Sequence, residues 1–240
     1  MNESQIEILA ESIEGMTAPK DCYILYSLLR SMAIDGDVLE IGSFKGRVTI
    51  CLAKAVEESG SGKLYAIDAN IRNTKECLLS NIAKYDVAKT VIPLFKSSVA
   101  ASHKWSRALK FIWIDTDLNY FSATCDFMLW EKYLLNGGII VFSGADVAAV
   151  NRVIAEQLIN SGRFSKIVCN GAIGYAVKDK QGVERLWFES FYLRATCFCY
   201  YSLKRIFFAA IGVLPFVRSD REFTLKRMIK KVFDCLLRVR

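Results

Sequence analysis

The stretch that most constrains the fold is Asp37-Val-Leu-Glu-Ile-Gly-Ser-Phe-Lys-Gly-Arg-Val-Thr49. A short apolar run passes through two glycines, Gly42 and Gly46, and continues into a segment of helical composition, 48–56. This order predicts a strand, a tight turn and the start of a helix. Glycines adopt backbone angles closed to other residues, and a helix N-terminus offers free N–H donors. The turn therefore suits a nucleotide-like ligand, and the alternative is a purely structural turn.

The spacing within this turn indicates which nucleotide it would bind. The turn lacks the middle glycine of the dinucleotide fingerprint G-x-G-x-x-G, and Glu40 precedes the turn. A carboxylate there would repel a pyrophosphate but would suit an amino or sulfonium group. The loop resembles the first motif of the class I S-adenosylmethionine (SAM) methyltransferases, and an NAD-dependent enzyme is disfavoured.

Composition limits the class of protein. The chain has 240 residues, of which 52% are hydrophobic, enough for one large domain or one domain with an appendage. Residues 1–14 are polar and acidic and show no secretion signal. The eight cysteines form no C-x-x-C pair and there is one histidine, His103. These features predict reduced thiols in a cytoplasmic protein, without a disulfide framework or zinc site.

Charge divides the chain near residue 190. Residues 191–240 contain eleven Lys/Arg and three acids, a net charge of +8, whereas residues 1–190 contain 21 bases and 22 acids, a net charge of −1. We therefore predict a methyltransferase-like domain over 1–190 and a basic extension over 191–240.

Apolar runs alternate with helical patterns along the first part of the chain. Together they predict an α/β fold with a Rossmann-like, doubly wound, seven-stranded sheet. The expected strands lie in 37–49, 62–68, 90–95, 110–114, 139–142, 164–169 and 173–177. The expected helices lie at 6–13, 22–30, 48–56, 73–85, 98–107, 121–135 and 147–160, with the break Asn136-Gly-Gly138 before the fifth strand.

Polar residues follow several predicted strands, at the sheet edge where open α/β sheets bind ligands. Asp68 ends the second strand and is suited to accept both ribose hydroxyls; alternatively it caps the next helix. Ser97 and Ser98 follow the third strand and could contact an adenine, or Ser98 could cap the following helix. His103 is expected to point away from the site.

The segment after the fourth strand contains the leading catalytic candidates. Asp115 and Asp117 emerge from an apolar run, and either could accept a proton from a hydroxyl nucleophile. Asn119 and Tyr120 are expected to bind the substrate. The structural alternative is that Asp117 caps the helix that begins near Asn119.

The order of these motifs resembles bacterial class I SAM methyltransferases over roughly residues 14–178. The matching pieces are Glu14-Gly15, Glu40-Ile-Gly-Ser-Phe-Lys-Gly-Arg-Val-Thr49, Tyr65-Ala-Ile-Asp68, Ile114-Asp-Thr-Asp-Leu-Asn-Tyr120 and Leu135-Asn-Gly-Gly-Ile-Ile-Val-Phe-Ser-Gly144. The resemblance implies SAM as cofactor, with Asp68 at its ribose and Asp115 at its reactive end. It also implies that Glu40, Gly42, Ser43, Phe44 and Gly46 border the cofactor.

The chain departs from the family pattern at three sites. Leu118 replaces a histidine, Ser143-Gly144 replace a histidine and an aspartate, and Lys96-Ser-Ser98 replace Gly-Asp-Ser. Divalent cations need several oxygen ligands, so we expect no metal site.

The extension is apolar and aromatic as well as basic. Its longest apolar run, 206–217, has 12 residues, too short to span a bilayer, for which about 20 are needed. Residues 225–237 place apolar and basic side chains on opposite helical faces. The extension is expected to bind a membrane surface or to pack on a partner, including a second copy of the chain; nucleic acid is not expected.

These observations predict a SAM-dependent methyltransferase. The resemblance points to O-methylation of a sugar, a glycan or a small hydroxylated acceptor, without a metal. A membrane-bound extension would favour a lipid-linked acceptor at the inner face of the cell membrane. The alternative is a non-catalytic SAM-binding or assembly protein that uses its tail as an interaction surface.

Overall fold

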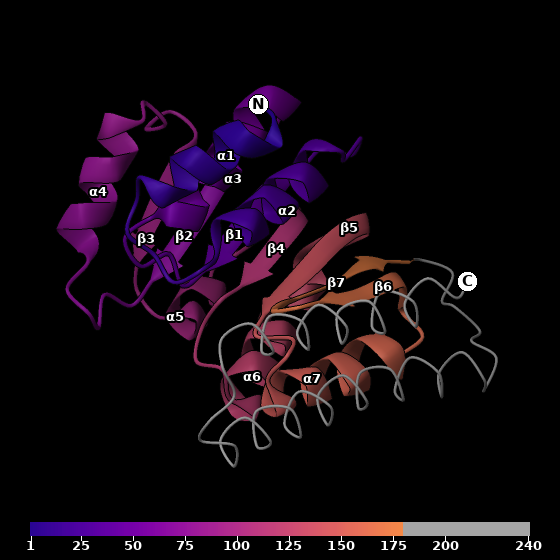
Figure 1. Cartoon of the computed structure of the whole chain (residues 1–240). Helices are drawn as coiled ribbons and strands as arrows, with labels where there is room; N and C mark the ends of the chain where they lie inside the picture. The colour runs from indigo at the N-terminus through magenta and orange to yellow at the C-terminus, as the bar shows by residue number, and fades with distance from the viewer. Residues whose placement is uncertain (180–240) are drawn as a thin grey trace, which may run out of the picture. The chain divides into compact units, whose positions relative to one another are not determined.

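A computed structural model describes residues 1–179, which form one seven-stranded sheet with helices on both faces (Figure 1). The strand order is β3-β2-β1-β4-β5-β7-β6. The strands are β1 (Asp37–Ile41), β2 (Leu64–Asp68), β3 (Val91–Phe95), β4 (Leu109–Ile114), β5 (Leu134–Ser143), β6 (Phe164–Asn170) and β7 (Ile173–Lys178). The predicted Rossmann-like, seven-stranded fold is confirmed.

The first five strands pair in parallel, and β7 pairs antiparallel with both β5 and β6. Ile41 on β1 pairs with Ile67 on one side and Ile114 on the other. The carboxyl ends of β1, β2 and β4 therefore meet at one edge of the sheet. The polar residues that follow these strands in the sequence lie at this edge.

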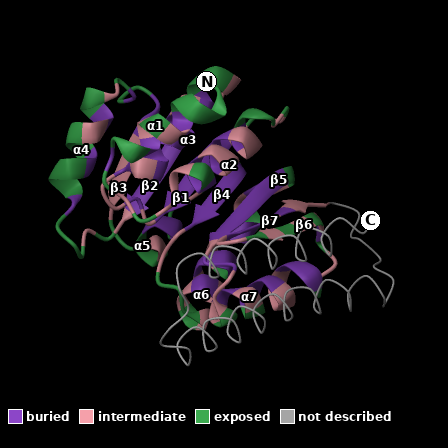
Figure 2. Cartoon of the chain, in the orientation of Figure 1, coloured by how far each residue is buried: buried purple, intermediate pink, exposed green. Residues whose placement is uncertain are grey.

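Alternating side chains along the central strands belong to two separate hydrophobic cores, one on each face of the sheet. On β4, Phe111 and Trp113 pack under α2 and α3, whereas Ile112 and Ile114 pack under α6 and α7. Both sets are buried, as the purple central strands in Figure 2 show. A strand covered on both faces has no solvent side, which explains why these runs are apolar throughout.

The helices before the fourth strand lie close to their predicted positions. They are α1 (Glu3–Glu11), α2 (Pro19–Arg30), α3 (Arg47–Ser59), α4 (Lys75–Lys84) and α5 (Ser98–Ser102). Helix α5 is shorter than the predicted 98–107, and His103 follows its last turn.

The boundaries after the fourth strand differ more. Helix α6 (Tyr120–Trp130) ends in a 3₁₀ turn, η1 (Glu131–Tyr133), where a helix to residue 135 was predicted. Strand β5 then runs through Asn136-Gly-Gly138, because Leu134 already pairs with Leu109. The predicted helix at 147–160 consists of α7 (Ala148–Val153) and a π-helical segment, η2 (Ile154–Ile159).

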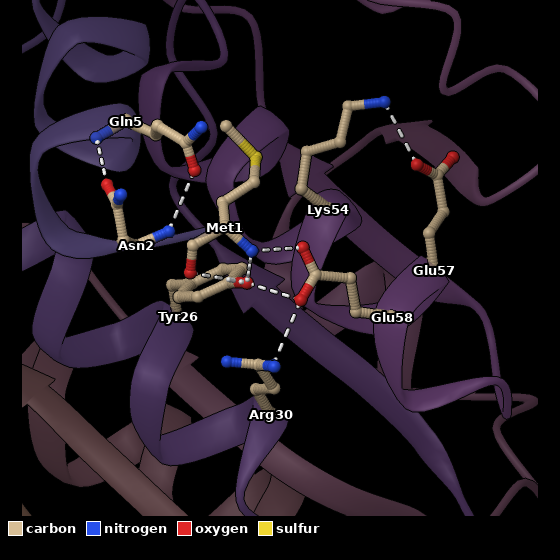
Figure 3. A network of polar contacts seen from close by, with 8 residues as sticks. All are labelled: Met1, Asn2, Gln5, Tyr26, Arg30, Lys54, Glu57 and Glu58. Atoms are coloured by element: carbon tan, nitrogen blue, oxygen red, sulfur yellow. Dashed lines mark hydrogen bonds and ion pairs between the residues drawn. The ribbon is translucent and has the colours of Figure 1, made fainter.

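A polar network joins the N-terminus to α2 and α3 (Figure 3). The Glu58 carboxylate accepts a hydrogen bond from the Tyr26 hydroxyl at 2.6 Å and lies 2.5 Å from the Met1 amino group. Arg30 pairs with the same carboxylate at 2.9 Å. These contacts fix the N-terminus and α2 against the last turn of α3.

The basic extension and the boundary near residue 190 lie outside the described residues, so both stay predictions. Within 1–179, no helix is long and apolar enough to cross a membrane. In the same part of the chain, no disulfide forms at Cys22, Cys51, Cys77, Cys125 or Cys169.

Candidate functional site

A cleft of about 290 Å³ opens at the carboxyl ends of β1, β2 and β4. Eight of the predicted site residues line it: Gly42, Ser43, Phe44, Asp68, Ser97, Ser98, Asp115 and Asp117. Segments that lie far apart in the sequence therefore line one cleft. Glu40, Gly46, Asn119 and Tyr120 do not line the cleft.

The two glycines of the first loop are required by the backbone. Both have left-handed φ angles, +99° at Gly42 and +96° at Gly46. A Cβ on residue 42 would lie 2.0 Å from the Asp115 carbonyl oxygen, and one on residue 46 would lie 2.8 Å from the Leu78 side chain. Gly42 thus lets β1 and β4 approach each other at the cleft, a structural reason that adds to the predicted ligand role.

The second strand holds the first loop through Asp68. Its Oδ2 accepts a hydrogen bond from the Phe44 backbone N–H at 2.7 Å, and its Oδ1 accepts one from the Asn70 N–H at 2.6 Å. Phe44 has a positive φ of 48°, which this bond stabilises. Each carboxylate oxygen can accept more than one bond, so Asp68 can hold the loop and still contact a ligand.

Glu40 lies beneath the cleft floor and is fully buried. Its Oε2 accepts a hydrogen bond from Thr49 on α3 at 2.6 Å, whereas Oε1 accepts none from the described residues. Burial raises the pKa of Glu40 to about 8, against the opposing effect of the Thr49 bond. A buried carboxyl with a free oxygen would be stabilised in its charged form by a ligand cation.

Asp115 lies at the end of β4 and lines the cleft. Its Oδ2 accepts a hydrogen bond from the Thr17 hydroxyl at 3.2 Å. Burial raises the pKa of Asp115, and hydrogen bonds from Ser143 and Thr17 oppose that rise. The carboxyl is therefore a better proton acceptor near neutral pH than an exposed aspartate.

The serines after β3 serve the local structure as well as lining the cleft. Ser97 caps α5 by accepting from the Ala100 N–H, so the predicted capping role falls on Ser97 in place of Ser98. The Ser98 hydroxyl accepts a hydrogen bond from the Trp130 indole at 2.7 Å.

Of the candidate residues after Asp115, Asp117 lines the cleft, whereas Asn119 and Tyr120 do not. Asp117 is exposed at the cleft, and the cap of α6 is Asn119, whose side chain accepts from the Ser122 N–H. The alternative role of Asp117 as the cap was therefore wrong. Tyr120 donates to Glu156 at 2.6 Å, and Arg152 lies over its ring.

Two departures from the family pattern contact each other. A Cβ on residue 144 would lie 2.6 Å from the Leu118 side chain, and Gly144 has a φ of +73°. Ser143, which precedes Gly144, contributes a hydrogen bond to Asp115. Within residues 1–179, no group of three or more His, Cys, Asp or Glu side chains could hold a metal.

One wall of the cleft consists of residues whose role was not predicted from the sequence. Gly15, Met16 and Thr17 line it, together with Arg47 and Arg72. Arg47 donates to the carbonyl oxygens of Ile13 and Thr17 at 2.8 Å and 2.7 Å. Two features of the sequence could have indicated this wall: the Glu14-Gly15 pair, and Arg47 in the first motif.

Comparison with known proteins agrees with this geometry. Residues 39–143 match the model of a protein family described as a methyltransferase domain. The matched range starts in β1 and ends in β5, so it contains the first loop, Asp68 and Asp115.

Solved structures of low sequence identity share the fold. An O-methyltransferase from Bacillus cereus in complex with SAH has a TM-score of 0.57 at 18% identity, covering 73% of this chain and 89% of that chain. The SAM complex of TomG from Streptomyces achromogenes, an O-methyltransferase involved in tomaymycin synthesis, scores 0.56 at 20% identity, covering 69% and 82%. SAH-bound PaMTH1 from Podospora anserina, a methyltransferase, scores 0.60 at 10% identity, covering 74% and 88%.

Residues 39–143 thus match a methyltransferase-domain family, and the described residues share the fold of solved SAM-dependent methyltransferases.

Proposed function

We propose that the chain is a metal-independent SAM-dependent O-methyltransferase whose acceptor is a sugar, a glycan or a small hydroxylated molecule. The observation that supports this most is the convergence of Gly42, Asp68 and Asp115 on one cleft. The residues fit the cofactor, because the cleft offers acidic groups for its ribose and its cationic parts. Bound SAM supplies an electrophilic methyl group.

The residues of this chain have distinct roles in the proposal. Asp68 accepts hydrogen bonds from the ribose hydroxyls while it holds the first loop through Phe44. Glu40, with one oxygen free, favours a positive charge above it. Asp115 accepts the proton that the acceptor hydroxyl loses, and its raised pKa suits that role. Ser97 and Ser98 border the adenine and Asp117 borders the acceptor. Asn119 and Tyr120 lie outside the cleft, where their side chains bond to Ser122 and Glu156.

Metal independence is supported by the departures from the family pattern. Leu118 and Gly144 together place an apolar contact where the family has a histidine and an aspartate. The Asp115 carboxylate is engaged by hydroxyl donors. The site therefore has hydrogen-bond donors where divalent cations need oxygen ligands.

Formation of SAH from SAM by the full chain tests this proposal, with methyl glycosides, glycolipids and catechol as acceptors. We expect turnover with a hydroxylated acceptor that EDTA leaves unchanged. Asp115→Asn should lower kcat about 100-fold at saturating SAM. Loss of turnover on chelation would contradict metal independence, and an active Asp115→Asn variant would contradict the assigned proton acceptor.

The basic extension suggests where the acceptor is presented. Its composition supports peripheral association with the inner face of the cell membrane and a lipid-linked acceptor; a partner or second subunit is the other reading. Sedimentation of the full chain with anionic vesicles, at low and high salt, separates the two, because a protein interface does not need lipid.

A second candidate is a SAM-binding protein without catalysis that uses the extension for assembly. The lost histidine and aspartate positions favour it, since a general base has been removed with them. It predicts SAH binding without turnover on any hydroxylated acceptor.

A further inference from the structure

Residues 13–17, here called the N-terminal segment, lie between α1 and α2, and Gly15, Met16 and Thr17 of this segment line one wall of the cleft. They contact two other walls, the first loop and the end of β4. These contacts join groups that are far apart in the sequence, since Thr17 and Asp115 are separated by 98 positions.

Arg47 holds the N-terminal segment at both ends. Its Nε donates to the Ile13 carbonyl at 2.8 Å, and its Nη1 donates to the Thr17 carbonyl at 2.7 Å. The planar guanidinium presents several donors in a fixed geometry, so one side chain fixes two backbone groups. Because Arg47 is the first residue of α3, the segment is tied to a buried helix.

The middle of the segment lies directly against the same side chain. A Cβ on residue 15 would lie 2.6 Å from the Arg47 Cβ and 2.9 Å from its Cδ and Nε. Gly15 thus permits a close approach, and the segment has little freedom to shift while Arg47 stays in place.

Thr17 connects this anchor to the cleft. Its hydroxyl donates to Oδ2 of Asp115 at 3.2 Å, while its own carbonyl is held by Arg47. A carboxylate at the end of a strand can rotate about its side-chain bonds, and a fixed donor selects one orientation. The hydroxyl also stabilises the ionised form of the carboxylate.

We propose that Arg47 and Thr17 are positioning residues for Asp115: Arg47 fixes the N-terminal segment so that the Thr17 hydroxyl holds the carboxylate toward the cleft. This inference rests on the proposed function, because it assumes that Asp115 acts in the binding site of the methyl donor. Neither residue needs to contact the reacting atoms.

The pH dependence of ligand affinity reports on this arrangement. Asp115 is faced by Thr17 and by Ser143 on β5, while Glu40 on β1 lies near enough for the two carboxyls to repel each other. Asp68 on β2 acts on Glu40 in the same way. Loss of the Thr17 donor should raise the pKa of Asp115, whereas the other groups are common to all variants.

The test is calorimetric titration of the full chain with SAH from pH 5 to pH 9, because the SAH amino group is a cation that an ionised carboxylate attracts. Thr17→Val removes the donor and keeps the shape, and Thr17→Ser keeps the donor. We expect the acid limb of the affinity profile to move to higher pH by about one unit in Thr17→Val. Thr17→Ser should retain the original profile.

Arg47→Met should move the limb in the same direction, and the double variant should move it no further than the larger single change. Glu14 lies on the same segment and forms an ion pair with Lys45. Glu14→Gln removes that pair and should leave the affinity profile unchanged. Unchanged profiles for Thr17→Val and Arg47→Met would overturn the inference alone. No SAH binding by the unmodified chain would overturn the proposed function, and this inference with it.

Discussion

Leu118 fills the space beside Gly144 in which a side chain on residue 144 would lie, with 2.6 Å between its Cδ2 and an added Cβ. These two positions are where the chain departs from the histidine and aspartate of the family that its motifs resemble. The contact means that the departures are coupled, because an aspartate at 144 could not be accommodated while Leu118 keeps its place.

The first prediction follows from that contact. Gly144→Ala should lower the free energy of unfolding, both because φ is +73° and because the methyl group meets Leu118. In a Leu118→Ala background the same change should cost about 1 kcal/mol less. Urea denaturation of the four chains measures the coupling; additive effects would show that the two residues are independent.

The second prediction separates close packing from backbone strain. Gly42→Ala should lower the free energy of unfolding by more than about 2 kcal/mol, because its Cβ meets the Asp115 carbonyl. Gly60→Ala is the matched control: its φ is +73°, and nothing lies within 4 Å of the added Cβ. It should cost roughly 1 kcal/mol. Equal losses in denaturant unfolding would refute the packing argument.

The third prediction concerns Glu40 and pH. Its pKa in the folded chain is about 8, above the ordinary value of 4.5. Between these values the unfolded chain has lost the proton and the folded chain retains it, so stability falls as pH rises. This contribution reaches about 1.4 kcal/mol per pH unit and ends near pH 8. Glu40→Gln should flatten the slope in denaturation series at several pH values; an unchanged slope would show that Glu40 does not cause it.

The fourth prediction concerns Glu58, whose contribution to stability changes with pH in the opposite direction. Burial of Glu58 is outweighed by the Met1 amino group, Tyr26 and Arg30, which lower its pKa. Its stabilisation is present above the ordinary value of 4.5 and is lost as pH falls through the lowered value. Glu58→Gln should cost roughly 1 kcal/mol at neutral pH and less in acid.

Thermal unfolding at pH 7 and pH 3 measures this effect. Glu57→Gln is the control, because Glu57 forms an exposed pair with Lys54 on the same helix (Figure 3). A Glu58→Gln loss that is equal at both pH values would point to packing in place of charge.

The strands were predictable because they are buried on both faces and therefore read as continuous apolar runs, as Phe111-Ile-Trp-Ile114 does. The start of β5 was not predictable. Gly137 and Gly138 indicate a break locally, yet the pairing of Leu134 with Leu109 continues the strand. Tertiary pairing outweighs local preference there.

The candidate site was predictable where residues follow strand ends in order, as Asp68 and Asp115 do. Thr17 was not, because its contact with Asp115 depends on how a turn before β1 folds over β4. Tyr120 contacts Glu156 for a similar reason: the direction of its side chain depends on the packing of α6 against α7 and η2.

The central claim is that the loop at Gly42 and the carboxylate of Asp68 hold an adenosyl donor. Equilibrium titration of the full chain with SAH tests this most directly. The account predicts saturable binding at one site per chain, weakened about tenfold or more by Asp68→Asn, since a charged hydrogen bond is lost. A flat titration of the unmodified chain would contradict it.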